Sequence, residues 1–142
     1  MIPSEHMFYG FFASLLVLFL FPSLGTFGFL IVFLSSFLID TDHYLAYVYL
    51  KRDFSLSRSV EFYLAMGHEH KTLRTKKTEP LMIFHTAEFW LLLVILSFFN
   101  LFFFYILIGV LIHVLLDLYS SKQLDILHVR PYSVIRHFLR KN

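Results

Sequence analysis

Cysteine is absent from the 142-residue sequence, and charged residues are scarce. The lack of cysteine excludes a disulfide scaffold, a thiolate zinc site and a cysteine nucleophile, which leaves histidine, aspartate and glutamate as the strong metal ligands. Charged residues make up 15% of the chain, against about a quarter in soluble domains, and the composition excludes a disordered protein. Lysine and arginine exceed aspartate and glutamate by only 12 to 10, a net charge of +2. So small a net charge says little about nucleic acid. The amphipathic parts of the middle segment and the tail are expected to pack and to anchor at lipid headgroups, and no nucleic acid is expected as a stable partner.

Hydrophobic residues, in contrast, form 58% of the chain, and the mean hydropathy is +0.69. Two long runs account for this value: residues 7–39 and residues 89–112 contain no Asp, Glu, Lys, Arg or His. A membrane-spanning helix needs about 20 apolar residues, so each run is too long for one crossing and about right for two. The first run is interrupted at Pro22–Gly25 and the second is divided at Asn100, and both breaks are typical of turns. The pattern predicts an integral membrane protein made of two helical hairpins.

The predicted fold is all-α, an integral membrane four-helix bundle with short cytoplasmic interfacial helices. All 12 Lys and Arg lie in a middle segment or in the carboxy-terminal tail, so the excess of positive charge places both termini in the cytoplasm of a multi-pass protein of the inner or plasma membrane. One interfacial helix is expected to end near Gly67 and another to lie in the tail. The predicted segments are transmembrane helices at 4–21, 26–47, 80–99 and 101–121, a cytoplasmic loop at 50–79 and a basic cytoplasmic tail at 122–142.

Ionisable side chains occur at the predicted cytoplasmic end of every one of these helices. A charged residue within a membrane segment costs several kcal/mol unless it is paired or hydrated, so such residues indicate function. His113 and Asp117 are four positions apart and share a helix face, and so do His85 and Glu88, which are three apart. The expected metal ligands are His6, Asp40, Asp42, His43, His85, Glu88, His113 and Asp117, with His68 and His70 of the loop as additional candidates.

Mixed imidazole and carboxylate ligands suit zinc, our first expectation, or manganese or iron, and this set is large enough for two or three ions. A pair of metal ions activates water and stabilises both oxygens in phosphoester hydrolysis. In this interpretation Glu88 or Asp42 bridges the ions or acts as the base. The basic cluster at Lys71–Lys77 would attract an anionic lipid headgroup.

Three short motifs carry a family resemblance: Leu38–His43 (LIDTDH), Phe84–Phe89 (FHTAEF) and Ile112–Asp117 (IHVLLD). Together they resemble the predicted membrane-bound metal-dependent hydrolases of the YdjM type, over nearly all of the chain from His6 to Asp117. The resemblance implies a kinship with zinc-dependent phospholipase C and its nuclease relatives, and it implies the same eight metal-site residues. Thr41 between the two acids and Thr86 after the histidine depart from the family pattern.

The leading function predicted is a phosphoester hydrolase that acts on a phospholipid or another phosphoester, and other functions are open beside it. One is a small non-enzymatic scaffold or accessory subunit of the membrane, in which a polar or metal cluster only locks helix pairing. A metal or proton carrier ranks last, because residues 91–112 offer only Ser97, Asn100 and Tyr105 as polar groups for a path. A lipid phosphate phosphatase needs an arginine shortly before the His of its H-x-x-x-D motif, and residues 101–112 contain none.

Overall fold

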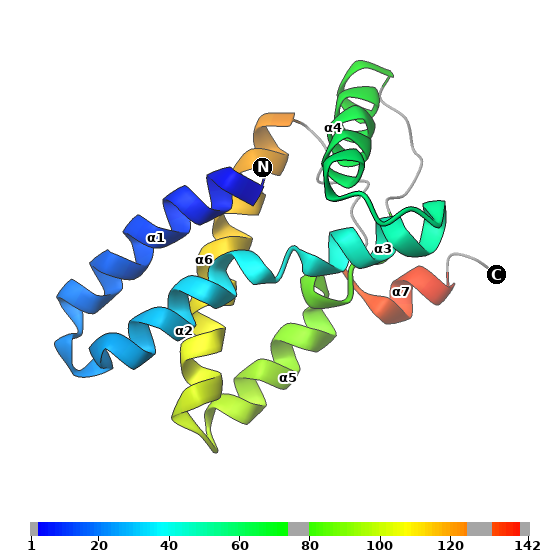
Figure 1. Ribbon diagram of the computed structural model, residues 1–142. Helices are drawn as coiled ribbons and strands as arrows, with labels where there is room; N and C mark the ends of the chain where they lie inside the picture. The colour runs from blue at the N-terminus through cyan, green and yellow to red at the C-terminus, as the bar shows by residue number, and fades with distance from the viewer. Residues whose placement is uncertain (1–2, 74–79, 125–131, 140–142) are drawn as a thin grey trace.

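The computed structural model describes residues 3–73, 80–124 and 132–139, and in them the chain is all-α (Figure 1). This confirms the all-α part of the predicted fold class for the described residues. The elements in chain order are α1 (Pro3–Leu20), the 3₁₀ turn η1 (Pro22–Leu24), α2 (Gly25–Leu38), α3 (Thr41–Lys51), α4 (Leu56–Leu73), the 3₁₀ turn η2 (Ile83–His85), α5 (Ala87–Ser97), α6 (Leu101–Leu124) and α7 (Val134–Leu139).

Two helical hairpins form the centre of the fold. α1 and α2 are joined through η1, α5 and α6 are joined at Asn100, and α2 packs along α6 between the two outer helices (Figure 1). Proline fixes the backbone at the first turn, and the Asn100 side chain accepts a hydrogen bond of 2.8 Å from the Phe102 amide at the second. Buried Val32 packs with Tyr105 towards the turns, and Ile39 packs with Val110 towards the opposite ends.

Small residues allow the central helices to approach closely. A Cβ atom added at Gly109 of α6 would lie less than 3.0 Å from the Val32 carbonyl oxygen of α2. A Cβ atom added at Gly10 of α1 would collide in the same way with the hydroxyl of Ser36 on α2. Close approach at small residues is typical of helices that associate in membranes.

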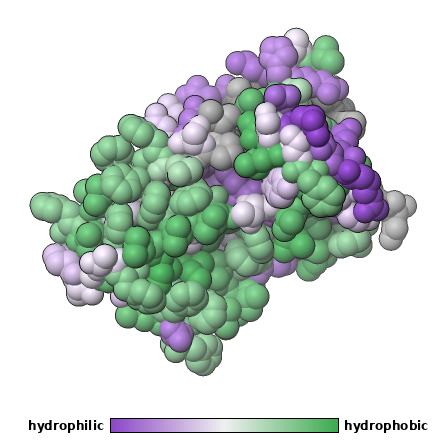
Figure 2. Space-filling view, viewed as in Figure 1, coloured by the Kyte–Doolittle hydropathy of each residue, from purple (hydrophilic) through white to green (hydrophobic). Residues whose placement is uncertain are grey.

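Two stretches are long and apolar enough to cross a membrane, judged by length and composition: Pro22–Lys51 and Leu101–Gln123. In an 18-residue window of each stretch 28% of the residues are buried inside the protein, and large apolar side chains such as Leu34 and Leu111 are exposed. α1 and α5 are shorter apolar helices. Figure 2 shows that hydrophobic residues cover the hairpin end of the molecule, whereas hydrophilic residues gather towards α4.

Two helices differ in their bounds from the predicted segments. The helix expected at 26–47 is divided at Ile39–Asp40, where the His43 amide donates to the Asp40 carbonyl three residues back instead of four. The helix expected at 80–99 begins at Ala87, because Thr86 is extended (φ −97°, ψ 150°) and its hydroxyl caps the Phe89 amide. α1 and α6 lie close to the predicted ranges.

The middle segment and the tail each contain a helix, α4 and α7, in agreement with the expected short helices. α4 continues through Gly67 to Leu73, where the sequence pattern placed its end near Gly67. Residues 74–79 and 125–131 are outside the described chain, and with them most of the predicted basic cluster at Lys71–Lys77 and part of the basic tail.

Candidate metal centre

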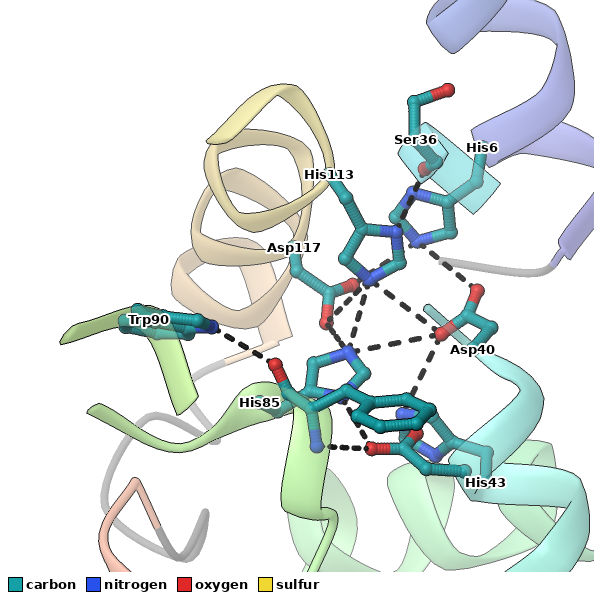
Figure 3. A network of polar contacts seen from close by, with 10 residues as sticks. His6, Ser36, Asp40, His43, His85, Trp90, His113 and Asp117 are labelled. Atoms are coloured by element: carbon teal, nitrogen blue, oxygen red, sulfur yellow. Dashed lines mark hydrogen bonds and ion pairs between the residues drawn. The ribbon is translucent and has the colours of Figure 1, made fainter. Parts of the chain in front are cut away.

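Imidazole and carboxylate groups from four parts of the chain meet at one end of the two hairpins (Figure 3). The groups come from the first turns of α1, the junction between α2 and α3, the turn η2 and the second half of α6. His6 and His113 are fully buried at the centre, and their rings stack 4.1 Å apart. Three overlapping groups have ligand atoms within 4.8 Å of one another: His6, Asp40 and His113; Asp40, His43 and His85; and His85, His113 and Asp117.

The cluster contains a close contact between the rings of His85 and His113. The Nε2 atoms of His85 and His113 are 3.0 Å apart. The Nδ1 atom of His113 lies 3.0 Å from the Ser36 carbonyl oxygen, and Nδ1 of His85 lies 3.1 Å from a carboxylate oxygen of Asp42. Because both of these partners only accept hydrogen bonds, each Nδ1 carries the proton. If both rings are neutral, the two Nε2 lone pairs converge at 3.0 Å, and the contact is satisfied either by a proton on one ring or by a metal ion that lies beside the pair and is bound by both nitrogens.

Asp40 and Asp117 each direct their two oxygens towards different imidazoles. Oδ1 of Asp117 lies 3.2 Å from Nε2 of His6, while its Oδ2 lies 3.8 Å from Nε2 of His85. Asp40 repeats the arrangement: its Oδ2 is 3.9 Å from Nε2 of His6, and its Oδ1 is 3.6 Å from Nε2 of both His43 and His113. A carboxylate placed in this way can hold a different ion with each oxygen.

The donor set fits a divalent transition metal. Two ligand atoms about 2.1 Å from one tetrahedral zinc ion are about 3.4 Å apart, and the measured separations between the imidazole nitrogens and carboxylate oxygens of the cluster run from 3.2 to 3.9 Å. Imidazoles form ion pairs with the carboxylates of Asp40, Asp42 and Asp117. Neutral imidazoles do not compensate buried carboxylates, whereas divalent ions do.

Asp42 lies beside the cluster and orients one of its ligands. Its Oδ2 accepts hydrogen bonds from the Phe84 amide at 3.0 Å and from Nδ1 of His85 at 3.1 Å, so the residue holds the His85 ring with Nε2 towards the cluster. Carboxylates commonly hold metal-binding histidines in this way. Asp42 is 7% exposed, and its Oδ1 has no hydrogen-bond partner among the residues that the structure describes.

Glu88 lies elsewhere, although its spacing predicted a shared helix face with His85. The extended Thr86 separates η2 from α5, so the i, i+3 relation of a continuous helix does not apply. The Glu88 carboxylate instead accepts hydrogen bonds at the start of α7, from the Ser133 hydroxyl at 2.6 Å and from the amides of Val134 and Ile135 at 3.1 and 3.3 Å.

The two loop histidines also lie outside the three ligand groups. His68 and His70 are on α4, and neither belongs to a group of potential metal ligands in the described chain. His68 is exposed and lies 3.5 Å from the Thr72 hydroxyl. His70 is buried (3% exposed) and lines a pocket between α3 and α4.

The corner between α3 and α4 is held by Asp53. Its carboxylate accepts hydrogen bonds from Nε and Nη2 of Arg58 at 2.6 and 2.7 Å, from the Tyr47 hydroxyl and from the Ser55 amide. The Arg58 guanidinium, followed by the Tyr47 hydroxyl and the Ser55 amide, holds the pKa of Asp53 well below its usual value. This corner fixes α4 relative to α3, which carries Asp42 and His43.

Sequence reasoning missed the carbonyl of Ser36 and the amide of Phe84, which fix the positions of His113 and Asp42. Both are main-chain groups, which every residue type except proline provides in full, so no side-chain pattern could have revealed them.

No protein-family model, no curated protein and no solved structure matches the chain. The chemistry of the site is therefore argued from its geometry.

Proposed function

We propose that the protein is a membrane-bound metal-dependent hydrolase that cleaves a phosphoester at this cluster, as its resemblance to the YdjM-type hydrolases implies. The observation that carries the proposal is the pair of Nε2 atoms of His85 and His113, 3.0 Å apart with both Nδ1 protons directed to acceptors. A proton on one ring would make this contact a hydrogen bond, whereas a metal ion bound by both nitrogens would make it part of a metal site. The carboxylates of Asp40 and Asp117 beside the two rings favour the divalent ion.

The membrane part of the proposal rests on the outward-facing apolar surface and on helix lengths. His6 lies about 21 Å from the end of α1 and His113 lies about 18 Å from the start of α6, at 1.5 Å per residue. In a hydrocarbon core about 30 Å thick, a bundle with its turns at one face therefore holds the cluster about 9–12 Å inside the other face. We propose that this face is the cytoplasmic one, with the four apolar helices α1, α2, α5 and α6 in the bilayer and α3, α4 and α7 at its surface.

Each residue of the cluster has a defined task in this proposal. His113 and His85 present their Nε2 lone pairs, held in place by the Ser36 carbonyl and by Asp42. Asp40 and Asp117 turn one oxygen towards His6 and the other towards the remaining histidines, so they divide the centre into two adjoining sites. When bound there, two zinc ions would lower the pKa of water and neutralise the charge of the phosphoester. The surrounding apolar helices exclude bulk water, which strengthens the electrostatic interactions inside.

Metal analysis is the test of the proposed centre. Purified full-length protein in lipid nanodiscs should contain about two equivalents of transition metal, and the loss of one ligand, as in His113→Ala or His85→Ala, should lower the content by at least half. His68→Ala is the matched control and should leave the content unchanged, because His68 is exposed and lies outside the ligand groups. Metal-free wild-type protein with intact helical structure would refute the proposal.

Activity distinguishes the hydrolase from the scaffold that the sequence left open. A hydrolase should release phosphate from 4-nitrophenyl phosphate or from an alkyl phosphate, and chelation followed by zinc addition should remove and restore this activity. In a scaffold, His113→Ala would lower thermal stability while no phosphate release is detectable with the wild type.

A further inference from the structure

The metal centre is unevenly buried, so it has a closed end and an open end. At the closed end the side chains of His6 and His113 are 1% and 0% exposed. At the open end the side chain of His43 is 20% exposed and that of Asp40 is 14% exposed. A solute that approaches the centre from outside therefore meets Asp40 and His43 first.

The carboxylate of Asp40 is available at the open end. Neither of its oxygens accepts a hydrogen bond from the residues that the structure describes, and the Nε2 atoms of His43 and His113 are each 3.6 Å from its Oδ1. Oδ1 of Asp42 differs, because it is closed off from the surroundings. A carboxylate offers about four lone-pair positions, so Asp40 has the capacity to bind an ion on the accessible side of the cluster.

Each end of the centre has one histidine of its own. Among the described residues, His6 occurs in one ligand group, with Asp40 and His113. His43 occurs in another, with Asp40 and His85 (Figure 3). A substitution of His6 or His43 therefore tests one end and leaves the ligand group of the other end in place.

The closed end also has the greater number of carboxylates. Oxygens of Asp117 and Asp40 lie 3.2 and 3.9 Å from Nε2 of His6, whereas the ligand group of His43 contains one carboxylate, that of Asp40. Ligand charge and rigidity increase the affinity of a site for a divalent ion. A zinc site with three protein ligands leaves a coordination position for water or substrate. The closed end is therefore expected to bind metal more tightly than the open end.

The open end depends on an element outside the two hairpins. His43 lies on α3, and its ring meets the Tyr63 ring of α4 edge-on, with the centroids 4.9 Å apart. His6 and His113 instead lie on α1 and α6 of the hairpins, and their rings stack. Peripheral elements open locally at a lower free energy than the centre of a fold. Movement of α3 and α4 can therefore displace His43 without separating the hairpins.

From these differences in burial, charge and support, we propose that the two ends bind metal unequally. His6 and His113 hold an enclosed ion, whereas Asp40, His43 and His85 hold an exchangeable ion and admit the phosphate of the substrate beside it. The inference rests on the proposed function and names the regulation of that site. The concentration of free metal controls the occupancy of the open end, so a protein that retains only the enclosed ion is folded and inactive.

Release of zinc to a chelator tests this inequality without relying on activity. The zinc-loaded full-length protein in nanodiscs would be mixed with excess 4-(2-pyridylazo)resorcinol, and the absorbance of the zinc complex followed. We expect two phases of similar amplitude, of which the second is slower by at least about tenfold because its ligands must first open to solvent. Release of all zinc in a single phase would overturn the inference.

Substitutions assign the two phases. His43→Ala should lack the fast phase and keep the slow one, whereas His6→Ala should lose the slow phase. His68→Ala is the control and should keep both, because His68 is exposed and lies outside the ligand groups. His43→Gln retains most of the side-chain volume and replaces His43→Ala if that variant does not fold. A fast phase that persists in the folded His43 variant would overturn the assignment.

Inorganic phosphate tests which end admits the substrate. In protein loaded with cobalt(II), the visible spectrum depends on the ligands of the ion, so phosphate should change the spectrum of the wild type. The His43→Ala protein, which retains only the enclosed ion, should show no change. An equal response of His43→Ala would place the phosphate at the closed end and overturn the inference.

The two proposals fail in different ways. Two release phases assigned to His43 and His6, in a protein that does not cleave 4-nitrophenyl phosphate, would leave the unequal sites standing and overturn the hydrolase. Cleavage of 4-nitrophenyl phosphate by a protein that releases its zinc in one phase would do the reverse. If both hold, activity should be lost with the fast phase and return when zinc is added.

Discussion

Substitution of Gly109 by alanine tests whether the packing of α2 against α6 controls the metal centre. The added Cβ atom would lie less than 3.0 Å from the Val32 carbonyl oxygen, and ordinary van der Waals contact begins at 3.4 Å. A main-chain oxygen cannot rotate away as a side chain can. To bring the Cβ atom and the oxygen from less than 3.0 Å to 3.4 Å, α2 and α6 must therefore separate by at least 0.4 Å. Gly109 is one turn before His113 on α6.

This separation reaches the centre through the contact between His113 and α2. The bond between Nδ1 of His113 and the Ser36 carbonyl is 3.0 Å long, and an increase of 0.4 Å takes it to 3.4 Å, beyond the usual range of about 2.7–3.2 Å. Loss of such an orienting hydrogen bond lowers metal affinity by about 10–100-fold. Overpacking in addition lowers the free energy of unfolding by about 1–3 kcal/mol. We expect both changes in Gly109→Ala.

Two glycine variants serve as controls, and zinc affinity would be measured by competition with a chromogenic chelator. Gly28→Ala crowds the Leu24 side chain near the hairpin turn, so it should lower stability and keep zinc affinity. Gly67→Ala on α4 has no atom within 4 Å of the added Cβ, so it should keep both and raise helix stability by about 0.5–1 kcal/mol. Wild-type zinc affinity in Gly109→Ala would refute the reasoning.

Two further predictions concern the parts outside the cluster. Glu88→Ala removes the acceptor for three donors at the start of α7, so limited proteolysis should cut the tail faster while the metal content stays at the wild-type value; an equal loss of metal would place Glu88 in the centre after all. Asp53 contributes stability in its ionised form because its pKa is lowered in the folded protein, so this contribution is complete above the ordinary value of 3.8 and is lost as the pH falls below it. Thermal melts of wild type and Asp53→Asn should therefore differ by a constant amount from pH 7 to 5 and converge below pH 3.8; a gap that widens towards low pH would contradict the assignment.

The hairpins and the level of the polar side chains could be predicted from the sequence because both follow from the order of apolar and polar residues. Pro22 and Asn100 divide the two apolar runs, and the structure turns at both places. Helices of similar length then bring their polar ends together, as observed for His6, His113 and the Asp40 region. The convergence of residues 6 to 117 is a consequence of helix length.

The location of the Glu88 carboxylate and the residues at which α3 and α5 begin could not be derived from periodicity. A pattern of side chains tells which residues share a face only where the helix is continuous, and two short interruptions broke this condition. One of them had a signal, because Thr86 is a residue type that commonly caps the start of a helix. The break at Ile39–Asp40 had a similar signal, because Asp40 precedes α3 and aspartate commonly caps a helix start, although its side chain makes no cap hydrogen bond here.

The hydrogen bond from His113 to the Ser36 carbonyl of α2 affects how the evolution of this site can be traced. A peptide oxygen has no residue identity, so an alignment column at position 36 would show no invariant partner for the imidazole. What constrains that column is bulk, because Gly10 leaves room for little more than a hydroxymethyl group there. Homologues that retain the orientation of the His113 ring should therefore vary among alanine, serine and glycine at position 36. In an alignment, the contact would then show only as covariation between positions 10 and 36.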